Sequence, residues 1–242
     1  MASVPSPLIA VVTGGNRGIG LATVRALAGV ADTVIMGTRS LEAGAAALET
    51  ETLAGVSNVV PMELDVASDA SVASFADAVK LAYGAVGILV NNAGIIGEET
   101  FGTPLLESRI EDFTRAFDVN TLGAIRMMQA LVPDMVAASY GRVVNISSGM
   151  GQLSDMGSGT SPYRLSKSAL NAATRVLANE VEGSGVFVVC TCPGFVDTDM
   201  TNHRGHIKPS EAAENIAYLA TLPSDAADHS GGFFRNKKRI DW

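Results

Sequence analysis

Short apolar runs alternate with longer amphipathic stretches along the chain. The runs are rich in β-branched residues, which is typical of strands buried on both faces of a parallel sheet. They predict strands at 8–13, 33–38, 59–64, 88–91, 142–147 and 186–192, with a last short strand near 232–234. Between them, Ala- and Leu-rich stretches at helical period predict helices at 19–28, 41–53, 71–83, 110–137, 162–182 and 210–222.

This alternation of strand and helix indicates the α/β class. Right-handed crossovers would place helices on both faces of a Rossmann-type, doubly wound parallel sheet. We see no linker, repeat or low-complexity segment, so we expect one domain covering residues 1–242. Ligands of such sheets bind beyond the carboxyl ends of the strands, near the point where the strand order reverses. The residues that follow each strand are therefore the candidates for chemistry.

The first strand is followed by T-G-G-N-R-G-I-G at 13–20, which opens the first predicted helix. Glycines allow a ligand to approach the backbone, and a helix N-terminus offers free N–H groups and a positive dipole end to a pyrophosphate. A glycine-rich turn without a ligand is the alternative, but the strand before it and the helix after it favour dinucleotide binding. The candidate contacts are Gly14, Asn16, Arg17, Gly18, Ile19 and Gly20.

The end of the second strand bears on the choice of dinucleotide. A carboxylate there is typical of NAD binding, whereas Met36-Gly37-Thr38-Arg39 ends in an arginine. Arg17 and Arg39 together could grip the 2′-phosphate of NADP(H), although either alone could be a surface residue. Asp65, followed by Val66, is a candidate acceptor for the adenine amino group, with capping of the next helix as its alternative.

Tyr163 and Lys167 lie four residues apart in S-P-Y-R-L-S-K, a spacing that places them on one face of a helix. Ser161 would cap this helix and Pro162 suits its first position. An ammonium beside a phenol is expected to lower the pKa of the phenol from its usual ~10, which suits acid–base chemistry. A lone Y-x-x-x-K can also be a solvated helix face.

Composition restricts the partners. The 242 residues carry a net charge of −8, which argues against a nucleic-acid backbone as the main partner. No apolar run approaches the ~20 residues of a membrane span, and the run at 8–12 leads directly into the glycine loop, unlike a signal peptide. We expect a cytoplasmic protein with reduced, buried Cys190 and Cys192, no metal site, and a solvated basic segment at 235–239.

The motifs occur in a defined order: TGGNRGIG at 13–20, LDV at 64–66, NNAG at 91–94, FDVN at 117–120, NISS at 145–148, YRLSK at 163–167 and PGFVDTDM at 193–200. In this order they resemble the short-chain dehydrogenase/reductases over essentially the whole chain. From GFVDTDM to its end the chain is most similar to the NADPH-dependent carbonyl reductase branch. The resemblance implies NADP(H) as cofactor and reduction of a ketone or aldehyde to an alcohol.

The resemblance also implies a catalytic set of Ser148, Tyr163, Lys167 and Asn120. Tyr163 would donate the proton, Ser148 would bond the same carbonyl oxygen, and Lys167 would hold the nicotinamide ribose. Asn120, if it bends its helix and binds a water, would link Lys167 to solvent, whereas a plain helix-interior amide is its alternative. Ser147 points to the opposite side of the strand from Ser148 and would be a structural hydroxyl.

Further positions follow from the same resemblance. Asn91 would tie strands together, and the remaining implied cofactor contacts are Asn92, Ala93, Gly94, Pro193, Val196 and Thr198. The candidate walls of the substrate pocket are Met150, Leu153, Phe195 and Met200, each of which could instead be ordinary packing. Residues 201–208 are short for a lid, which suggests an open site that accepts varied carbonyl compounds.

Two departures from the family pattern bear on the loop before Tyr163 and on assembly. The spacing of fifteen residues from Ser148 to Tyr163 is slightly longer than the commonest one. The long insertion that precedes the tyrosine in monomeric carbonyl reductases is missing, so we expect a homodimer or homotetramer formed through the helices at 121–137 and 162–182. Alcohol oxidation in the reverse direction, a non-catalytic NADP(H)-sensing protein and a dehydratase or epimerase are the alternative functions.

Overall fold

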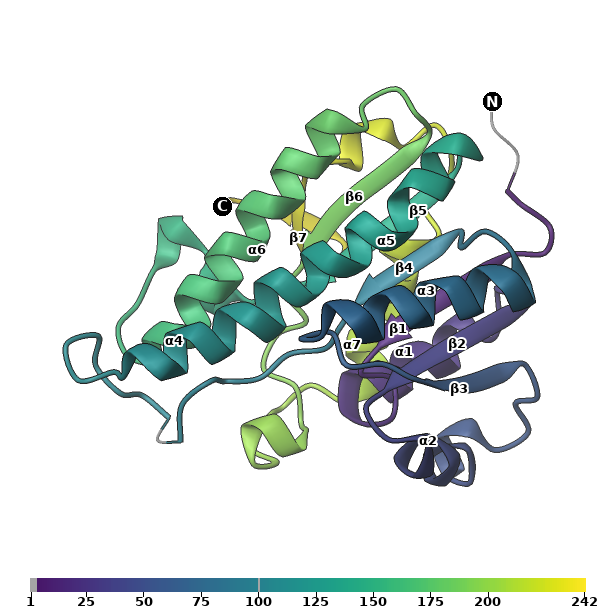
Figure 1. Ribbon diagram of the computed structural model, residues 1–242. Helices are drawn as coiled ribbons and strands as arrows, with labels where there is room; N and C mark the ends of the chain where they lie inside the picture. Colours follow the sequence, from purple (N-terminus) through teal and green to yellow (C-terminus); the bar gives the residue numbers. More distant parts are fainter. Residues whose placement is uncertain (1–3, 100) are drawn as a thin grey trace.

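The computed structural model describes residues 4–99 and 101–242. Eight strands of the described chain form one sheet in the order β3-β2-β1-β4-β5-β6-β7-β8 (Figure 1). The strands are β1 (Ile9–Thr13), β2 (Thr33–Thr38), β3 (Val59–Glu63), β4 (Ile88–Asn91), β5 (Gly141–Ile146), β6 (Val186–Thr191), β7 (Phe233–Arg235) and β8 (Lys238–Ile240). All neighbours are parallel except β7 and β8.

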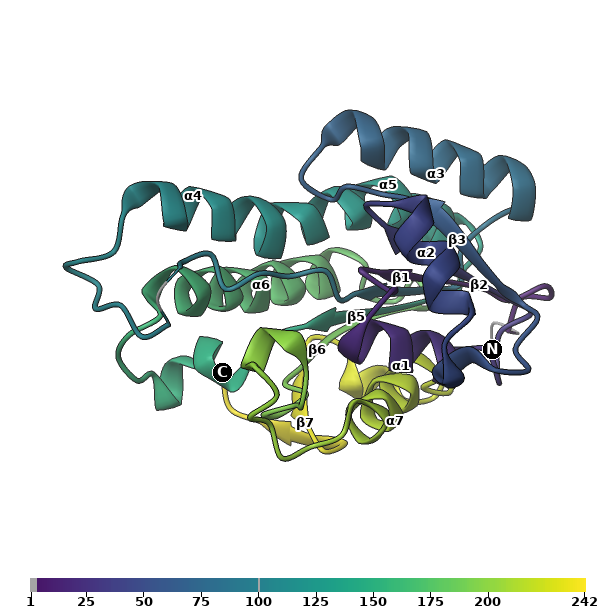
Figure 2. The same ribbon diagram turned by 90° about the horizontal axis from the view of Figure 1, so that it is seen from below.

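Helices cover both faces of this sheet. They are α1 (Gly18–Leu27), α2 (Leu41–Leu48), α3 (Asp69–Tyr83), α4 (Ile110–Phe117), α5 (Gly123–Ala137), α6 (Ser161–Glu180) and α7 (Pro209–Ala220). Figure 2 shows α3, α4, α5 and α6 on one side of the sheet and α1 and α7 on the other. The predicted doubly wound α/β architecture is confirmed.

The core explains why the strands read as continuous apolar runs. In β1, Ala10 and Val12 belong to the apolar cluster under α1 and α7, whereas Ile9 and Val11 belong to the cluster under α3, α5 and α6. Because successive side chains of a strand point to opposite faces, and both faces are covered, residues 9–12 of β1 must all be apolar.

The strand order reverses between β1 and β4, since β2 and β3 extend the sheet from one side of β1 and β4 extends it from the other. The carboxyl ends of these two strands therefore flank the crevice in which such sheets bind their ligands. In Figure 1 the carboxyl ends of the parallel strands point to the left.

The long helix predicted at 110–137 is interrupted. Residues Asp118–Leu122 form a π-helical segment between α4 and α5, and it includes Asn120. A π segment shifts the register of the backbone hydrogen bonds by one residue and leaves the apolar period nearly intact, so the pattern did not reveal it. The helix predicted at 41–53 also differs, because α2 ends at Leu48 and a short 3₁₀ turn, Glu51–Leu53, follows.

The basic segment at 235–239 is mostly exposed, as expected, and it is ordered as part of the β7–β8 hairpin. Arg235 ends β7, Asn236 (φ 50°) and Lys237 (φ 62°) form the tip, and Lys238 and Arg239 belong to β8. Two residues with positive φ are typical of the tight turns that join antiparallel strands. Lys238 and Arg239 are exposed, but the side chain of Arg235 is partly buried against the loop that follows β5.

Two further expectations concern the cysteines and the membrane. Cys190 and Cys192 are both free and buried, as predicted. No helix in the part of the chain that the structure describes is long and apolar enough to cross a membrane.

Candidate active site

The loop between β1 and α1 is fastened to the end of β4. The side-chain amide of Asn92 donates to the carbonyl oxygens of Thr13 (2.9 Å) and Gly14 (3.1 Å). The hydroxyl of Thr13 accepts the backbone N–H groups of Asn92 (3.0 Å) and Ala93 (2.9 Å). Thr13 and Asn92 thus join the two strand ends that flank the crevice.

The glycines of this loop are required by its conformation and by space. Gly14 (φ +62°) and Gly18 (φ +54°) lie in the left-handed region. A Cβ on Gly20 would lie 2.2 Å from the carbonyl oxygen of Gly14, which no side chain tolerates. No side chain caps the start of α1, so the first N–H groups of the helix are left to a ligand. A pyrophosphate fits this cradle.

The segment after β6 closes the cradle from the other side. The side chain of Thr198 lies 3.3 Å from the position that a Cβ on Gly18 would take. Val196 is buried and pairs with Ile207, which brings the end of the short lid back to its beginning. Pro193 lies near the start of this segment, separated from β6 by Cys192.

The two arginines expected at a 2′-phosphate have different surroundings. The N–H of Gly15 bonds the carbonyl oxygen of Gly37 (3.1 Å), so the end of β2 lies beside the loop and Arg39 is exposed just beyond it. Arg17, also exposed, forms an ion pair with Asp199 (3.0 Å). Sequence reasoning missed this ion pair, because partners 182 positions apart in the sequence give no local signal.

Asp65 does not cap the helix that follows it, because the N-cap of α3 is Ser68. Its carboxylate accepts the N–H of Ala67 (3.0 Å) in the turn that leads into α3. Val66 is buried, and a Cβ on Gly123 of α5 would lie 2.8 Å from its side chain. Contacts of Asp65 and Val66 with an adenine stay predictions.

Helix α6 presents Tyr163 and Lys167 to the crevice from a buried position. Tyr163 is 9% exposed and Lys167 4% exposed, so the solvated-face alternative is wrong. The predicted cap, Ser161, is instead the first helical residue, and Thr160 precedes it in a left-handed conformation (φ 52°). Pro162 lies in the first turn, as expected.

Burial sets the ionisation of the tyrosine. It raises the pKa of Tyr163 to about 12, and a hydrogen bond with Ser148 offsets only part of that effect. The Lys167 ammonium lies 5.7 Å from the centre of the Tyr163 ring. The expected lowering of the phenol pKa is therefore wrong for this structure. The phenol is neutral and keeps the proton that a general acid must donate.

The ammonium of Lys167 is buried, and few hydrogen bonds offset the free-energy cost of removing its charge from water. It donates to the carbonyl oxygen of Ile146 (2.7 Å), and burial lowers its pKa to about 8. A Cβ on Gly94 would lie 3.4 Å from this ammonium and 3.2 Å from the amide oxygen of Asn120. Because Gly94 has no side chain, space is left beside two polar groups. An ammonium with spare N–H donors fits the hydroxyls of a ribose there.

Asn120 joins three elements of the site. Its amide group accepts the N–H of Ile95 (2.8 Å) and donates to the Ile95 carbonyl (2.8 Å) and to the Ser166 hydroxyl (2.9 Å). It lies in the π segment, so the helix is indeed distorted at Asn120, as its expected role required. The link from Lys167 to solvent through a water stays a prediction.

The two adjacent serines at the end of β5 have separate surroundings. The hydroxyl of Ser147 is buried and donates to Asn171 (2.5 Å), a structural bond. The oxygen of Ser148 accepts the N–H of Met150 (3.1 Å) and lies beside Tyr163. Asn91 ties β4 to β5 through Asn145 (2.8 Å), as expected.

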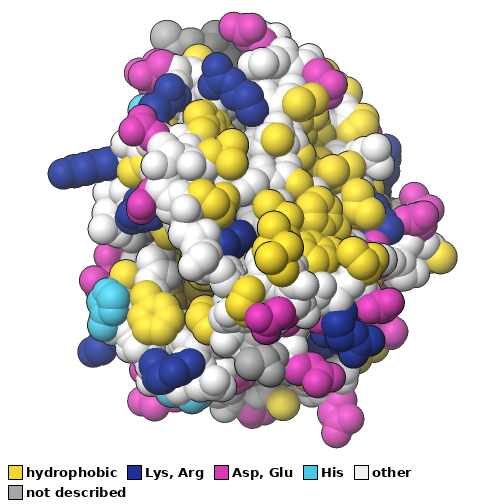
Figure 3. Space-filling view, turned by 90° about the vertical axis from the view of Figure 1, so that its left-hand side faces the viewer, with side chains coloured by type: hydrophobic (Ala, Val, Ile, Leu, Met, Phe, Trp, Pro, Cys, Tyr) yellow, Lys and Arg dark blue, Asp and Glu magenta, His cyan; other side chains and the backbone are white. Residues whose placement is uncertain are grey.

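The residues expected at the substrate are partly open to solvent. Leu153 is 70% exposed, Phe195 45% and Met200 44%, and Met150 is half-buried. Figure 3 views the molecule from the side to which the carboxyl ends of the strands point, and it shows hydrophobic side chains gathered there among charged ones. An apolar, accessible surface thus accompanies the polar centre.

Comparison with known proteins identifies the family. Residues 8–208 match the family model described as short chain dehydrogenase. The chain belongs to the short-chain dehydrogenase/reductase family. It is 33% identical to the (+)-neomenthol dehydrogenase of Arabidopsis thaliana, with 96% of this chain and 97% of that protein covered. The family resemblance inferred from the motifs is confirmed.

Two solved structures show the same fold with the cofactor bound. One is the NADPH-bound carbonyl reductase from chicken fatty liver, at a TM-score of 0.79 and 25% identity over 98% of this chain and 99% of that one. The other is a metagenomic short-chain oxidoreductase in complex with NADP, at a TM-score of 0.77 and 31% identity over 92% and 94%. Members of this family are oxidoreductases that use a nicotinamide dinucleotide on small-molecule substrates.

The buried ammonium leads to a prediction on stability. Because the pKa of Lys167 (about 8) lies below its ordinary value of 10.5, the charged lysine destabilises the folded state below about pH 8, and this cost disappears as the pH rises toward 10.5. Relative to Lys167→Met, we expect the unfolding free energy of the wild type to rise by up to ~3 kcal/mol over that range.

Denaturant unfolding at a series of pH values measures this difference. Lys208→Met removes an exposed lysine and serves as the control, for which we expect a flat difference. A flat difference for Lys167→Met as well would contradict the lowered pKa.

Proposed function

We propose that this protein is an NADPH-dependent carbonyl reductase, which converts a ketone or aldehyde to an alcohol by hydride transfer with Tyr163 as general acid. The observation that carries the proposal is the buried, neutral phenol of Tyr163 hydrogen-bonded to Ser148, with the Lys167 ammonium on the same helix face. On this proposal residues 1–242 form one cytoplasmic domain.

The reduction needs donors aimed at the oxygen on which negative charge builds. Two hydroxyls are available, those of Tyr163 and Ser148. The Ser148 oxygen accepts a bond from the Met150 N–H, and its hydroxyl, which bonds Tyr163 in this structure, could donate to a carbonyl oxygen placed beside the two hydroxyls. Tyr163 would give its proton to the developing alkoxide. Burial of Tyr163 strengthens its bond relative to water.

NADP(H) supplies the hydride when it is bound. The glycine loop would hold the pyrophosphate, Arg17 and Arg39 the 2′-phosphate, and Lys167 the nicotinamide ribose. On the nicotinamide side, Gly94 leaves the space beside Lys167. The further proposed contacts are Asn16, Ile19, Asp65, Val66, Asn92, Ala93, Pro193, Val196 and Thr198.

The relatives support this reading over the alternatives. One relative is named as a dehydrogenase of an alcohol and one structural neighbour as a carbonyl reductase. The same residues would catalyse alcohol oxidation in reverse, so the direction depends on the redox state of the cofactor pool. A non-catalytic NADP(H)-sensing protein would not need the buried Tyr163 and Lys167 together with Ser148.

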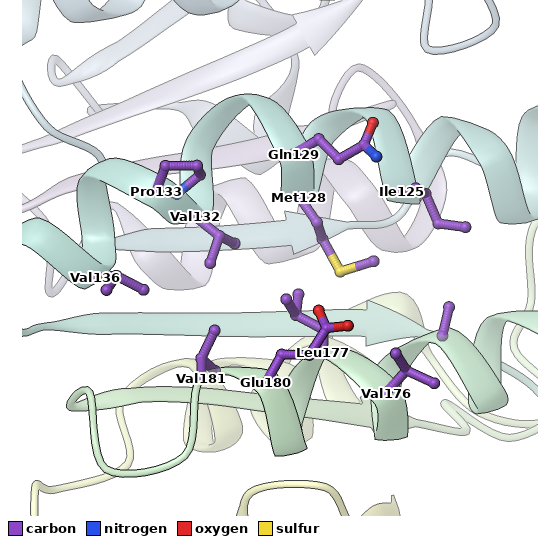
Figure 4. Close-up of a pocket in the computed structure, with 11 residues that line it drawn as sticks. Ile125, Met128, Gln129, Val132, Pro133, Val136, Val176, Leu177, Glu180 and Val181 are labelled. Atoms are coloured by element: carbon purple, nitrogen blue, oxygen red, sulfur yellow. The ribbon is translucent and has the colours of Figure 1, made fainter.

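We also propose a homodimer or homotetramer formed through α5 and α6. An apolar groove of about 630 Å³ runs between these helices (Figure 4). Its side chains include Ile125, Met128, Val132, Val136, Val176 and Leu177. Val176 is 56% exposed and Val136 38%, an exposure that the same face of a second copy would remove.

The first test is an NADPH-oxidation screen over ketones and aldehydes. We expect the wild type to consume NADPH with some of them, and Tyr163→Phe to lower kcat by about 10²- to 10⁴-fold through loss of the proton donor. NADPH binding to Tyr163→Phe, followed by fluorescence, is the control for correct folding. A wild type that binds NADPH tightly but reduces none of the compounds would contradict the proposal that this protein is an enzyme.

The second test concerns the choice of cofactor. We expect Arg39→Ala to weaken NADPH binding by about 10- to 100-fold, the range of a charge-assisted hydrogen bond, and to change NADH binding little. Arg25→Ala removes the same charge from the last turn of α1, away from the glycine loop that precedes this helix. It should change the binding of neither NADPH nor NADH. Equal losses for NADPH and NADH would mean that Arg39 does not contact the 2′-phosphate.

The third test concerns assembly. We expect the wild type to show two or four subunits of 25.0 kDa by light scattering. Val176→Glu buries a charge in the proposed interface and should shift the mass toward one subunit, whereas Leu81→Glu, on an exposed position of α3, should not. A wild-type mass of one subunit at micromolar concentration would contradict the proposal.

A further inference from the structure

The loop that follows Ser148 is held from two sides. Its first turn, Gly149–Gly151, is tied to α6, because the carbonyl oxygen of Gly151 accepts bonds from the Ser168 hydroxyl (3.0 Å) and the Asn171 amide (3.1 Å). Its second turn, Leu153–Asp155, is tied to the end of the β7–β8 segment, where the N–H of Ser154 donates to the carbonyl oxygen of Trp242 (2.8 Å).

The side chain of Trp242 fixes the position of that carbonyl. It stacks on Phe233 at 5.7 Å between ring centres, with the ring planes 24° apart. Phe233 is fully buried in a small apolar cluster with Cys190 and Cys192. The thiol of Cys192 in turn accepts the N–H of Gly149 (3.1 Å), so the same cluster also contacts the first residue of the loop.

A third contact lies between the two turns. The guanidinium of Arg235 reaches Gln152 (3.5 Å) and lies directly against Gly149, where a Cβ would come within 2.3 Å of it. Any side chain at position 149 would push Arg235 away. The β7–β8 hairpin and the loop thus pack closely against each other at Gly149 and Gln152.

We propose that Trp242 is a positioning residue: it sets the position of the second turn of this loop, Leu153–Asp155, and thereby of the proposed substrate wall at Leu153. This inference rests on the proposed carbonyl reduction. The first turn, Gly149–Gly151, orients Ser148 through the Met150 N–H, and it keeps its own bonds when the Trp242 side chain is lost, because Gly151 is bonded to α6 and Gly149 to the Cys192 thiol. Loss of the Trp242 side chain therefore loosens the wall and leaves the proton donors in place. Binding of the carbonyl substrate is affected, while binding of the dinucleotide is not.

The kinetic test uses the best ketone of the screen with Trp242→Ala and Trp242→Phe. We expect Trp242→Ala to raise the KM for the ketone about three- to tenfold, the effect of losing one net hydrogen bond, with kcat and the KM for NADPH changed less than about twofold. Phenylalanine keeps a ring to stack on Phe233, so Trp242→Phe should restore most of the affinity.

The control is Ile240→Ala, which removes an apolar side chain from the same cluster but contributes no bond to the loop. We expect it to lower stability without raising the KM for the ketone. An equal rise in KM for Ile240→Ala, an unchanged KM for Trp242→Ala, or a parallel fall in kcat would each overturn the assignment to Trp242.

Amide hydrogen exchange tests the anchor without turnover. In Trp242→Ala the amides of residues 152–155 should exchange faster than in the wild type, those of α6 should be unchanged, and Trp242→Phe should return them toward wild-type rates. Unchanged exchange in this segment would overturn the inference even if the enzyme reduces ketones. A protein that reduces no ketone yet shows the change would instead contradict the proposed function.

Discussion

A buried ammonium with no counterion among the described residues is the constraint around which the site is arranged. Within residues 4–99 and 101–242 two cations are buried, and their surroundings differ. Arg142, 1% exposed, donates to the carbonyl oxygens of Leu222, Gly141 and Gly185 and lies over the rings of Tyr140 and Phe187. Lys167, 4% exposed, donates a hydrogen bond to one acceptor among the described residues, the carbonyl oxygen of Ile146. Arg142 is a satisfied structural group, whereas Lys167 retains donors for a ligand.

The surroundings of Lys167 keep those donors available. Gly94 leaves space that a side chain would fill, and the π segment turns the Asn120 amide toward the same space. No carboxylate raises the lysine pKa, and burial lowers it to about 8. A carboxylate there would stabilise the fold, but it would also occupy the ammonium and compete with ribose hydroxyls. The site thus gives up stability for binding capacity, as functional sites commonly do.

Features with local causes were predicted well from the sequence. Strands buried on both faces show as apolar runs, the glycine loop follows from backbone conformation, and the i, i+4 pairing of Tyr163 and Lys167 follows from helix geometry. The predictions that were wrong concern features that depend on tertiary surroundings. The phenol pKa rises instead of falling because burial outweighs the hydrogen bond with Ser148, and burial cannot be read from a four-residue spacing. The β7–β8 hairpin was missed because its second strand is short, exposed and basic.

The ion pair between Arg17 and Asp199 joins the phosphate loop to the segment that leads into the lid. Both side chains are mostly exposed, at 67% and 61%, so the pair contributes at most ~1 kcal/mol. A 2′-phosphate offers more acceptor oxygens and more charge than one carboxylate, so on the proposed function it would take Arg17 from Asp199.

Asp199 would not then be left without a partner. His203 bridges Asp197 (2.9 Å) and Asp199 (3.2 Å), and its hydrogen bonds to the two carboxylates raise its pKa. His203 therefore keeps hydrogen bonds to both carboxylates whether or not Arg17 is engaged. On the proposed function, transfer of Arg17 to a phosphate would cost only the weak, exposed pair, which would make this arginine an adaptable contact. Arg39, which forms no ion pair within the described residues, would then be the more direct determinant of cofactor choice.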